Sequence, residues 1–156
     1  MNEYLLEAKE ELKRLEHIIY VSLKYTRTVD VLINALNRLV STYDLIIEGF
    51  LEIAREQKLI ESLPKSPALR ATTLGGLYPE DKELQKYLTF YAFLKNVLKL
   101  PPSKREEYRR HVTLIVELDK ATAEINIDNL MNCQAFMHRF FDYAWGKMGG
   151  KPEEEE

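Results

Sequence analysis

The sequence predicts a mainly helical protein: an antiparallel four-helix bundle, with a small β-hairpin at about 112–127 in one of two readings. The first observation is a seven-residue hydrophobic repeat across 28–54, because residues three, four and seven apart share one helix face. The second is the width of this stripe, whose three apolar rows need several partner helices. The third is that glycine and proline, six of each, gather where helices can end. The rows are Val29, Leu36, Tyr43 and Phe50; Leu32, Leu39, Ile46 and Ile53; and Ile33, Val40, Ile47 and Ala54.

The first two helices are predicted over residues 3–24 and 28–60. Leucine and isoleucine repeat every seven residues along the first helix, and glutamates near its start favour the positive end of the helix dipole. Neither glycine nor proline enforces the break between the two helices. Thr26 or Thr28 is expected to cap the second helix, which makes the two helices antiparallel neighbours joined by a tight turn.

Proline and glycine mark residues 62–79 as a loop with room for one short turn. A third helix is predicted over 80–99, because acidic residues occupy its first turn and apolar residues recur on one face. Pro101 and Pro102 end this helix, since proline lacks the backbone donor and clashes with the preceding turn. The residues Ser-Lys-Arg-Glu at 103–106 match a capping box, which predicts that a helix restarts there.

Residues 112–127 support two readings. Alternating apolar and polar residues, many of them β-branched, favour a hairpin, while helical spacing also fits part of the segment. Asp128 is then expected to cap the last helix, over 129–146. The result is a single helical-bundle domain over 1–146, followed by an acidic tail at 147–156 that is expected to be disordered.

The composition narrows the classes of function. A net charge of −3 provides no chain-wide basic field for nucleic acid or for an anionic membrane. The single cysteine, Cys133, cannot form an internal disulfide and is interpreted as a small apolar side chain in a reducing compartment. No apolar run reaches the length of a membrane span, and the first residues do not resemble a secretory signal. We therefore expect a cytoplasmic protein without membrane contact.

Most catalytic signatures are missing from the sequence. It has no glycine-rich phosphate loop, no nucleophile elbow and no paired-cysteine motif, so no cofactor and no metal ion are expected. His138 and Asp142 are spaced to share a metal ion on one helix face, and a hydrogen-bonded surface pair is the simpler reading. Most of the nine tyrosines follow helical core spacing, which favours packing over a stacking platform for single-stranded nucleic acid.

The segment from Arg105 to His111 is the remaining candidate for a site. Arg105, Arg109 and Arg110 offer guanidinium groups of the kind that bind phosphate. A neutral His111 beside them is able to move a proton at physiological pH. This pairing suits metal-independent RNA cleavage, in which a base removes the 2′-hydroxyl proton while arginine stabilises the charge on phosphorus. Ion pairs with neighbouring glutamates on a solvated helix explain the same residues without any function.

The helix layout over about 3–145, together with an arginine, five residues and a histidine, resembles the HEPN superfamily. Members of that superfamily are helical bundles of similar size, usually dimers, with an arginine, four to six residues and a histidine as their active-site signature. The resemblance implies that Arg105 and His111 are catalytic, and that a homodimer brings two such pairs to one cleft. It also implies that Arg109 and Arg110 steer the RNA backbone.

Three functional hypotheses fit these observations. The first is a non-catalytic helical module that forms a homodimer or binds a partner protein, based on the wide heptad stripe and the lack of a convergent site. The second is a HEPN-like endoribonuclease, for which RNA is the partner. The third is a bundle that binds a small ligand or a metal ion, with His138, Asp142 or buried tyrosines as its pocket.

Overall fold

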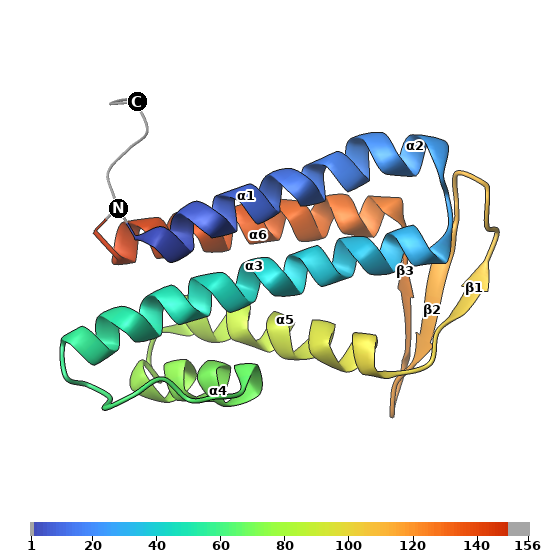
Figure 1. Cartoon of the computed structure of the whole chain (residues 1–156). Helices are drawn as coiled ribbons and strands as arrows, with labels where there is room; N and C mark the ends of the chain where they lie inside the picture. Colours follow the sequence, from blue (N-terminus) through green and yellow to red (C-terminus); the bar gives the residue numbers. More distant parts are fainter. Residues whose placement is uncertain (1, 150–156) are drawn as a thin grey trace.

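The computed structural model describes residues 2–149 of the chain. It is mainly helical, with a three-stranded antiparallel sheet at one end of the helices (Figure 1). The predicted tail at 147–156 lies outside the described residues from 150 onward. The elements are α1 Glu3–His17, the π-helical segment η1 Ile18–Ser22, α2 Leu23–Tyr25, α3 Val29–Glu56, α4 Pro67–Leu77, α5 Lys82–Lys99, β1 Ser103–Arg105, β2 Thr113–Glu117, β3 Thr122–Ile125 and α6 Ile127–Lys147.

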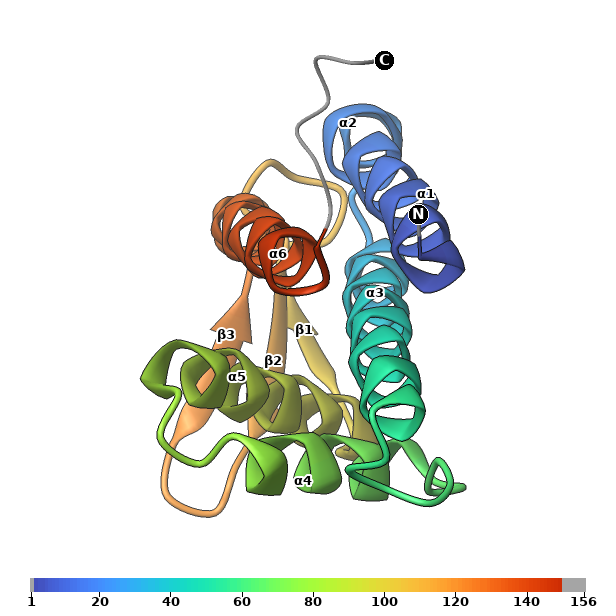
Figure 2. The same cartoon turned by 90° about the vertical axis from the view of Figure 1, so that its left-hand side faces the viewer.

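Helix α3 is the central element, and it contacts α1, α4, α5 and α6 (Figure 2). Its predicted heptad stripe is confirmed, since Leu32, Leu39 and Ile46 are fully buried. The predicted cap at Thr28 is also confirmed, because the Val31 amide donates to the Thr28 hydroxyl oxygen at 3.3 Å. Because this helix reaches every other long helix, it organises one continuous hydrophobic core.

The predicted first helix over 3–24 is confirmed as a nearly continuous helical segment. α1 passes into the single π-helical turn η1 and then into α2, which ends at Tyr25. Asn2 caps the start of α1, because its side-chain oxygen accepts a hydrogen bond from the Tyr4 amide at 2.8 Å. α1 lies alongside both α3 and α6, so its apolar face is buried while its outer face remains accessible (Figure 1).

The prediction of a loop over 62–79 is wrong, because this segment contains helix α4. The Ser66 hydroxyl accepts a hydrogen bond from the Leu69 amide at 3.1 Å, and Pro67 occupies the first turn, where its missing N–H costs nothing. Two glycines inside α4 lower its intrinsic propensity by about 1 kcal/mol each. Burial of Leu74 against the core offsets that cost. Helix propensity alone does not include this burial, so it does not predict α4.

The hairpin reading of 112–127 is confirmed by β2 and β3, which pair with Leu114 opposite Ile125. The predicted helix restart at 103–106 is wrong, because residues 103–105 form β1 and pair with β2 instead. The backbone of Glu106 has a φ of +56°, so the chain turns out of the strand where a capping box would continue into a helix. A third strand thereby covers an edge of β2 that a bare hairpin would leave exposed.

The last helix begins two residues earlier than predicted, so the assignment of Asp128 as its cap is wrong. Asn126 is the cap: its side-chain oxygen accepts from the Asn129 amide at 2.8 Å. The Asn129 side chain accepts from the Asn126 amide in return, at 3.0 Å, which completes a capping box. Asp128 lies in the first turn of α6, where its charge is favourable to the helix dipole.

The expectation of a mainly helical fold is confirmed, but a simple antiparallel four-helix bundle is not, since α4 and the sheet also belong to the core. An aromatic layer joins α3, α5 and α6. Tyr43 packs on Phe140 and Tyr91, with ring centroids 5.0 and 5.1 Å away. The Tyr43 hydroxyl donates to the backbone oxygen of Tyr87 at 2.7 Å, and burial raises the pKa of Tyr43 above its usual value. Within the described residues, none of the helices combines the length and apolarity needed to cross a bilayer.

Candidate functional site

Arg105 and His111 lie at the same end of the sheet, where the chain passes from β1 to β2. Arg105 ends β1, and its guanidinium binds both carboxylate oxygens of Glu124 on β3, at 2.8 and 3.4 Å. This pairing raises the pKa of Arg105 and lowers that of Glu124. His111 is exposed just before β2, and its backbone oxygen accepts from the Thr113 hydroxyl at 2.8 Å. Among residues 2–149, no hydrogen bond joins the Arg105 and His111 side chains.

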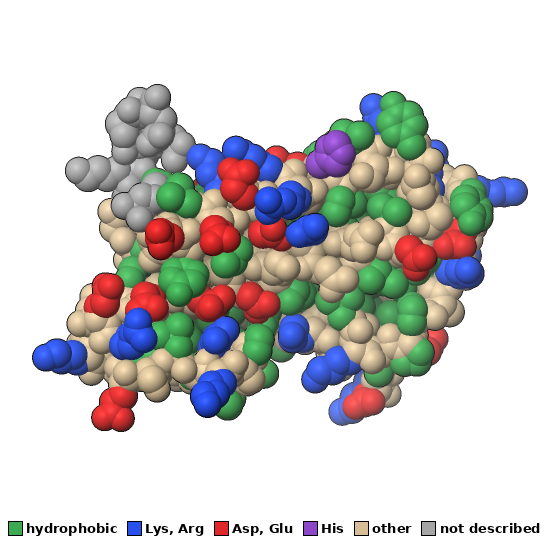
Figure 3. All heavy atoms as spheres, viewed as in Figure 1, with side chains coloured by type: hydrophobic (Ala, Val, Ile, Leu, Met, Phe, Trp, Pro, Cys, Tyr) green, Lys and Arg blue, Asp and Glu red, His purple; other side chains and the backbone are tan. Residues whose placement is uncertain are grey.

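The predicted phosphate-binding residues Arg109 and Arg110 are both exposed on the loop between β1 and β2. The Arg110 guanidinium forms an ion pair with the Asp128 carboxylate at 3.0 Å. Two of the three predicted phosphate-binding guanidinium groups are therefore already paired with carboxylates. These carboxylates compete with a phosphate for the same guanidinium donors. Figure 3 shows acidic and basic side chains intermixed over the face of the molecule seen in Figure 1.

A structural role accounts for the loop between β1 and β2. The Glu107 carboxylate accepts a hydrogen bond from the Val29 amide at 2.9 Å, at the first turn of α3, and Lys104 pairs with the same carboxylate at 3.2 Å. The Tyr108 amide donates to the Arg27 carbonyl at 2.6 Å, and Tyr108 itself has a φ of +70°. The loop thus supplies an acceptor and a negative charge where the α3 dipole is positive.

We expect Glu107→Gln to reduce stability at neutral pH and to flatten its acid dependence. The Val29 amide, and then Lys104, lower the pKa of Glu107 below its ordinary value of 4.5. A carboxyl with a depressed folded-state pKa contributes stability above its unfolded pKa and loses it as pH falls through the folded pKa. Urea unfolding should therefore show a larger difference between the two proteins at pH 7 than at pH 3. Glu106→Gln, at the exposed neighbour, is the matched control, and an equal loss in it would contradict the capping role.

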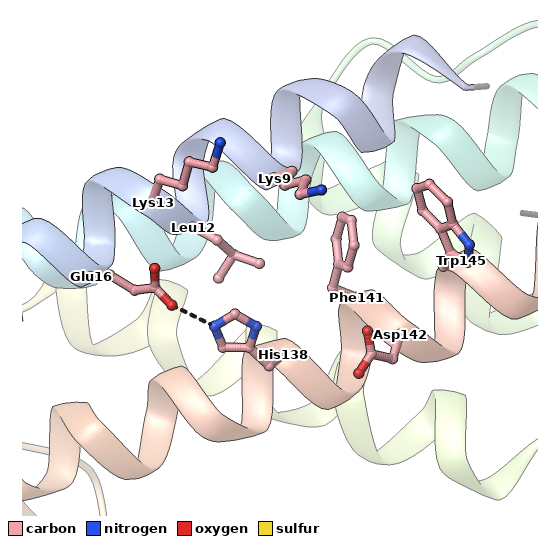
Figure 4. A pocket seen from close by; sticks show the side chains of 8 residues that line it. All are labelled: Lys9, Leu12, Lys13, Glu16, His138, Phe141, Asp142 and Trp145. Atoms are coloured by element: carbon pink, nitrogen blue, oxygen red, sulfur yellow. Dashed lines mark hydrogen bonds and ion pairs between the residues drawn. The ribbon is translucent and has the colours of Figure 1, made fainter. Parts of the chain in front are cut away.

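A groove of about 390 Å³ between α1 and α6 is a second candidate site, and its volume is sufficient for a small ligand or for side chains of a partner. Figure 4 shows that α1 forms one wall and α6 the other. Leu12, Phe141 and Trp145 supply its apolar surface. The remaining lining residues are polar or charged: Lys9, Lys13, Glu16, His138 and Asp142.

A polar network fixes α1 against α6 at one end of this groove. Glu16 Oε2 lies 3.0 Å from His138 Nε2 and accepts a hydrogen bond from the Gln134 side-chain amide at 2.8 Å. The Tyr20 hydroxyl donates to the Gln134 side-chain oxygen at 3.0 Å. The partner of His138 is thus Glu16, and not Asp142 as the spacing within α6 indicated. In Figure 4 the second nitrogen of His138 points away from Glu16, where a neutral ring offers an acceptor.

Charge is unevenly distributed between the two walls of the groove. The α1 wall carries the Lys9 and Lys13 ammonium groups together with the Glu16 carboxylate, which contacts His138, and the α6 wall carries the Asp142 carboxylate (Figure 4). Lys13 also pairs with Glu10 at 3.3 Å, but both side chains are more than half exposed, so this pair holds the lysine only weakly. In residues 2–149, no three His, Cys, Asp or Glu side chains are grouped so that they could hold a metal ion.

The sequence predicted the residues of the α6 wall but not those of the α1 wall. His138 and Asp142 share a helix face by their spacing, and both line the groove as the third hypothesis requires. The α1 wall was missed, although Leu6, Lys9 and Lys13 begin a row at three- and four-residue spacing that would have indicated one face. Which α6 residues lie opposite that row depends on how two helices more than a hundred residues apart are aligned, and sequence periodicity carries no such information.

Other predicted features have a structural role. Cys133 is half-buried against the core, as expected of a small apolar side chain, and burial raises its pKa to about 11. Tyr43, Tyr87 and Tyr91 are buried, which confirms core packing for these tyrosines. Tyr25 is the clearest exception, with 84% of its surface exposed at the end of α2.

Comparison with protein-family models, with curated proteins and with solved structures finds no match to this chain. The resemblance to the HEPN superfamily therefore stays a prediction from the sequence. Two features of the structure bear on function: the loop between β1 and β2, and the α1–α6 groove.

Proposed function

We propose that this protein is a non-catalytic helical interaction module of HEPN-like type that acts as a homodimer in the cytoplasm. The observation that carries the proposal is an open groove on the outer face of α1 and α6. There, half-buried aromatic side chains and charged groups line the groove, and no described helix or strand packs over it (Figure 2). Apolar surface rimmed by charged residues is typical of a protein interface.

The contacts at the sheet end support the non-catalytic part of this proposal. Arg105 would have to release Glu124 before it could hold a phosphate, and Arg110 would have to release Asp128. Glu107 is engaged at the start of α3, so the loop that carries these arginines is anchored to the core. Ion pairs and helix capping account for the segment that resembles a catalytic motif.

Light scattering over a range of protein concentrations, with an RNA-cleavage assay in EDTA on the same samples, tests this function. We expect the wild type, Arg105→Ala and His111→Ala to share one dimeric mass and one dissociation constant, and to leave RNA intact. Both substitutions are at exposed side chains, so the folded state should be retained.

Two results would contradict the proposal. A wild-type protein that stays monomeric at high concentration would exclude the homodimer. Metal-independent RNA cleavage by the wild type that is lost in His111→Ala would instead establish the endoribonuclease, with Arg105 and His111 as its catalytic pair.

A further inference from the structure

We infer that the second copy of the chain docks on the α1–α6 groove, with the two-fold axis of the dimer running along the groove. The inference rests on the proposed function and adds the surface and the symmetry. It follows from three properties of the groove: the alignment of its two walls, their opposite charge, and the apolar side chains between and beyond them.

Three contacts align the two walls of the groove. The Asn2 side-chain amide lies 3.7 Å from Met148 Sδ, at one end of the antiparallel pair. Glu16 meets His138 near the other end, and one turn farther on Tyr20 meets Gln134. By this alignment Lys13 is level with Phe141 and Asp142, and Lys9 is level with Trp145. These two lysines and the three α6 residues level with them line the groove.

The opposite charges of the walls select the direction of the axis. A two-fold axis along the groove places the α1 wall of one copy over the α6 wall of the other, at the same level. Lys13 then faces the partner's Asp142, and the partner's Lys13 faces Asp142, so both pairs are of opposite charge. An axis across the groove, between the levels of Lys9 and Lys13, would instead place the α1 walls on each other and bring Lys9 of each copy against Lys13 of the other, which is unfavourable for close like charges.

Apolar side chains extend along the same face. Leu12 lies at the floor, while Phe141 and Trp145 are half-buried and present part of their rings to the groove. Leu6 is 46% exposed and Tyr20 is 47% exposed, near the two ends of one row that runs from α1 into η1. This row spans about 21 Å at 1.5 Å per residue. An isologous contact uses such a self-complementary patch twice, and the aromatic rings would form its anchors.

Charge reversal tests the inference directly. Lys13→Glu alone creates two Glu–Asp pairs in the dimer, and Asp142→Lys alone creates two Lys–Lys pairs. We expect each variant to weaken association by about 100-fold, because two like-charge pairs replace two attractive ones. An equimolar mixture should recover a dimer with one copy of each variant, since both contacts then join opposite charges. Light scattering and native mass spectrometry measure the mass and the composition.

Exposed residues in the turn between β2 and β3 provide the matched control. Lys120→Glu and Asp119→Lys make the same changes of net charge away from the groove, and both should associate as the wild type does. A wild-type dimer that Lys13→Glu leaves unaffected, or variants that stay monomeric when mixed, would overturn the docking geometry and leave the homodimer intact. A monomeric wild type would overturn the proposed function itself.

Discussion

Replacing Tyr43 with alanine is expected to lower the free energy of unfolding by about 3–5 kcal/mol, the range for removing a buried aromatic side chain. Tyr43 is fully buried where α3, α5 and α6 meet, and it contacts the rings of Tyr91 and Phe140. The truncation removes both ring contacts and leaves a cavity that three separate helices would have to close. Urea unfolding followed by circular dichroism measures the loss.

Tyr43→Phe separates the ring from its hydroxyl. It keeps the packing but removes the 2.7 Å hydrogen bond to the Tyr87 carbonyl, so we expect a loss of only about 1–2 kcal/mol. Because the phenylalanine ring still fills the site, its unfolding should remain cooperative. Equal losses in the alanine and phenylalanine variants would show that the hydroxyl, and not ring packing, stabilises the junction.

Leu114→Ala is expected to lower the free energy of unfolding by about 2–5 kcal/mol. Leu114 is 1% exposed in β2, which contacts α3, so its side chain belongs to the same core as the helices. The next residue, Ile115, points to the opposite face of the sheet and is half-buried. Ile115→Ala should therefore cost less, about 1 kcal/mol, as is usual for a partly exposed position.

Trp145 provides the readout for the Leu114 variant. It is the single tryptophan of the chain and lies in α6, away from the sheet. If the sheet and the helices form one cooperative unit, tryptophan fluorescence and circular dichroism will report the same lowered midpoint. An unchanged fluorescence midpoint in Leu114→Ala would mean that the sheet unfolds separately, and the single core would be incorrect.

The sequence alone was sufficient for features that depend on local pattern. The heptad rows identified α3 and its buried face, because an apolar stripe at helical spacing is removed from water when that face packs on the core. Thr28 was expected as one of two caps and is the cap observed. The alternation of apolar and polar residues, many of them β-branched, favoured the hairpin, which β2 and β3 form. In each case the information lies within a few residues of the position it describes.

Tertiary contacts decided the remaining features. α4 forms despite Gly75 and Gly76 because Leu74 is buried, an energy that local propensity does not include. The sequence of residues 103–106 matches a capping box, but Ser103 pairs with Ile115 of β2, so a strand forms there in place of a helix. The same physical reason applies to the groove. Each of its walls has a recognisable helical face, but only the alignment of α1 with α6 brings Lys13 and Asp142 into the same groove, on opposite walls.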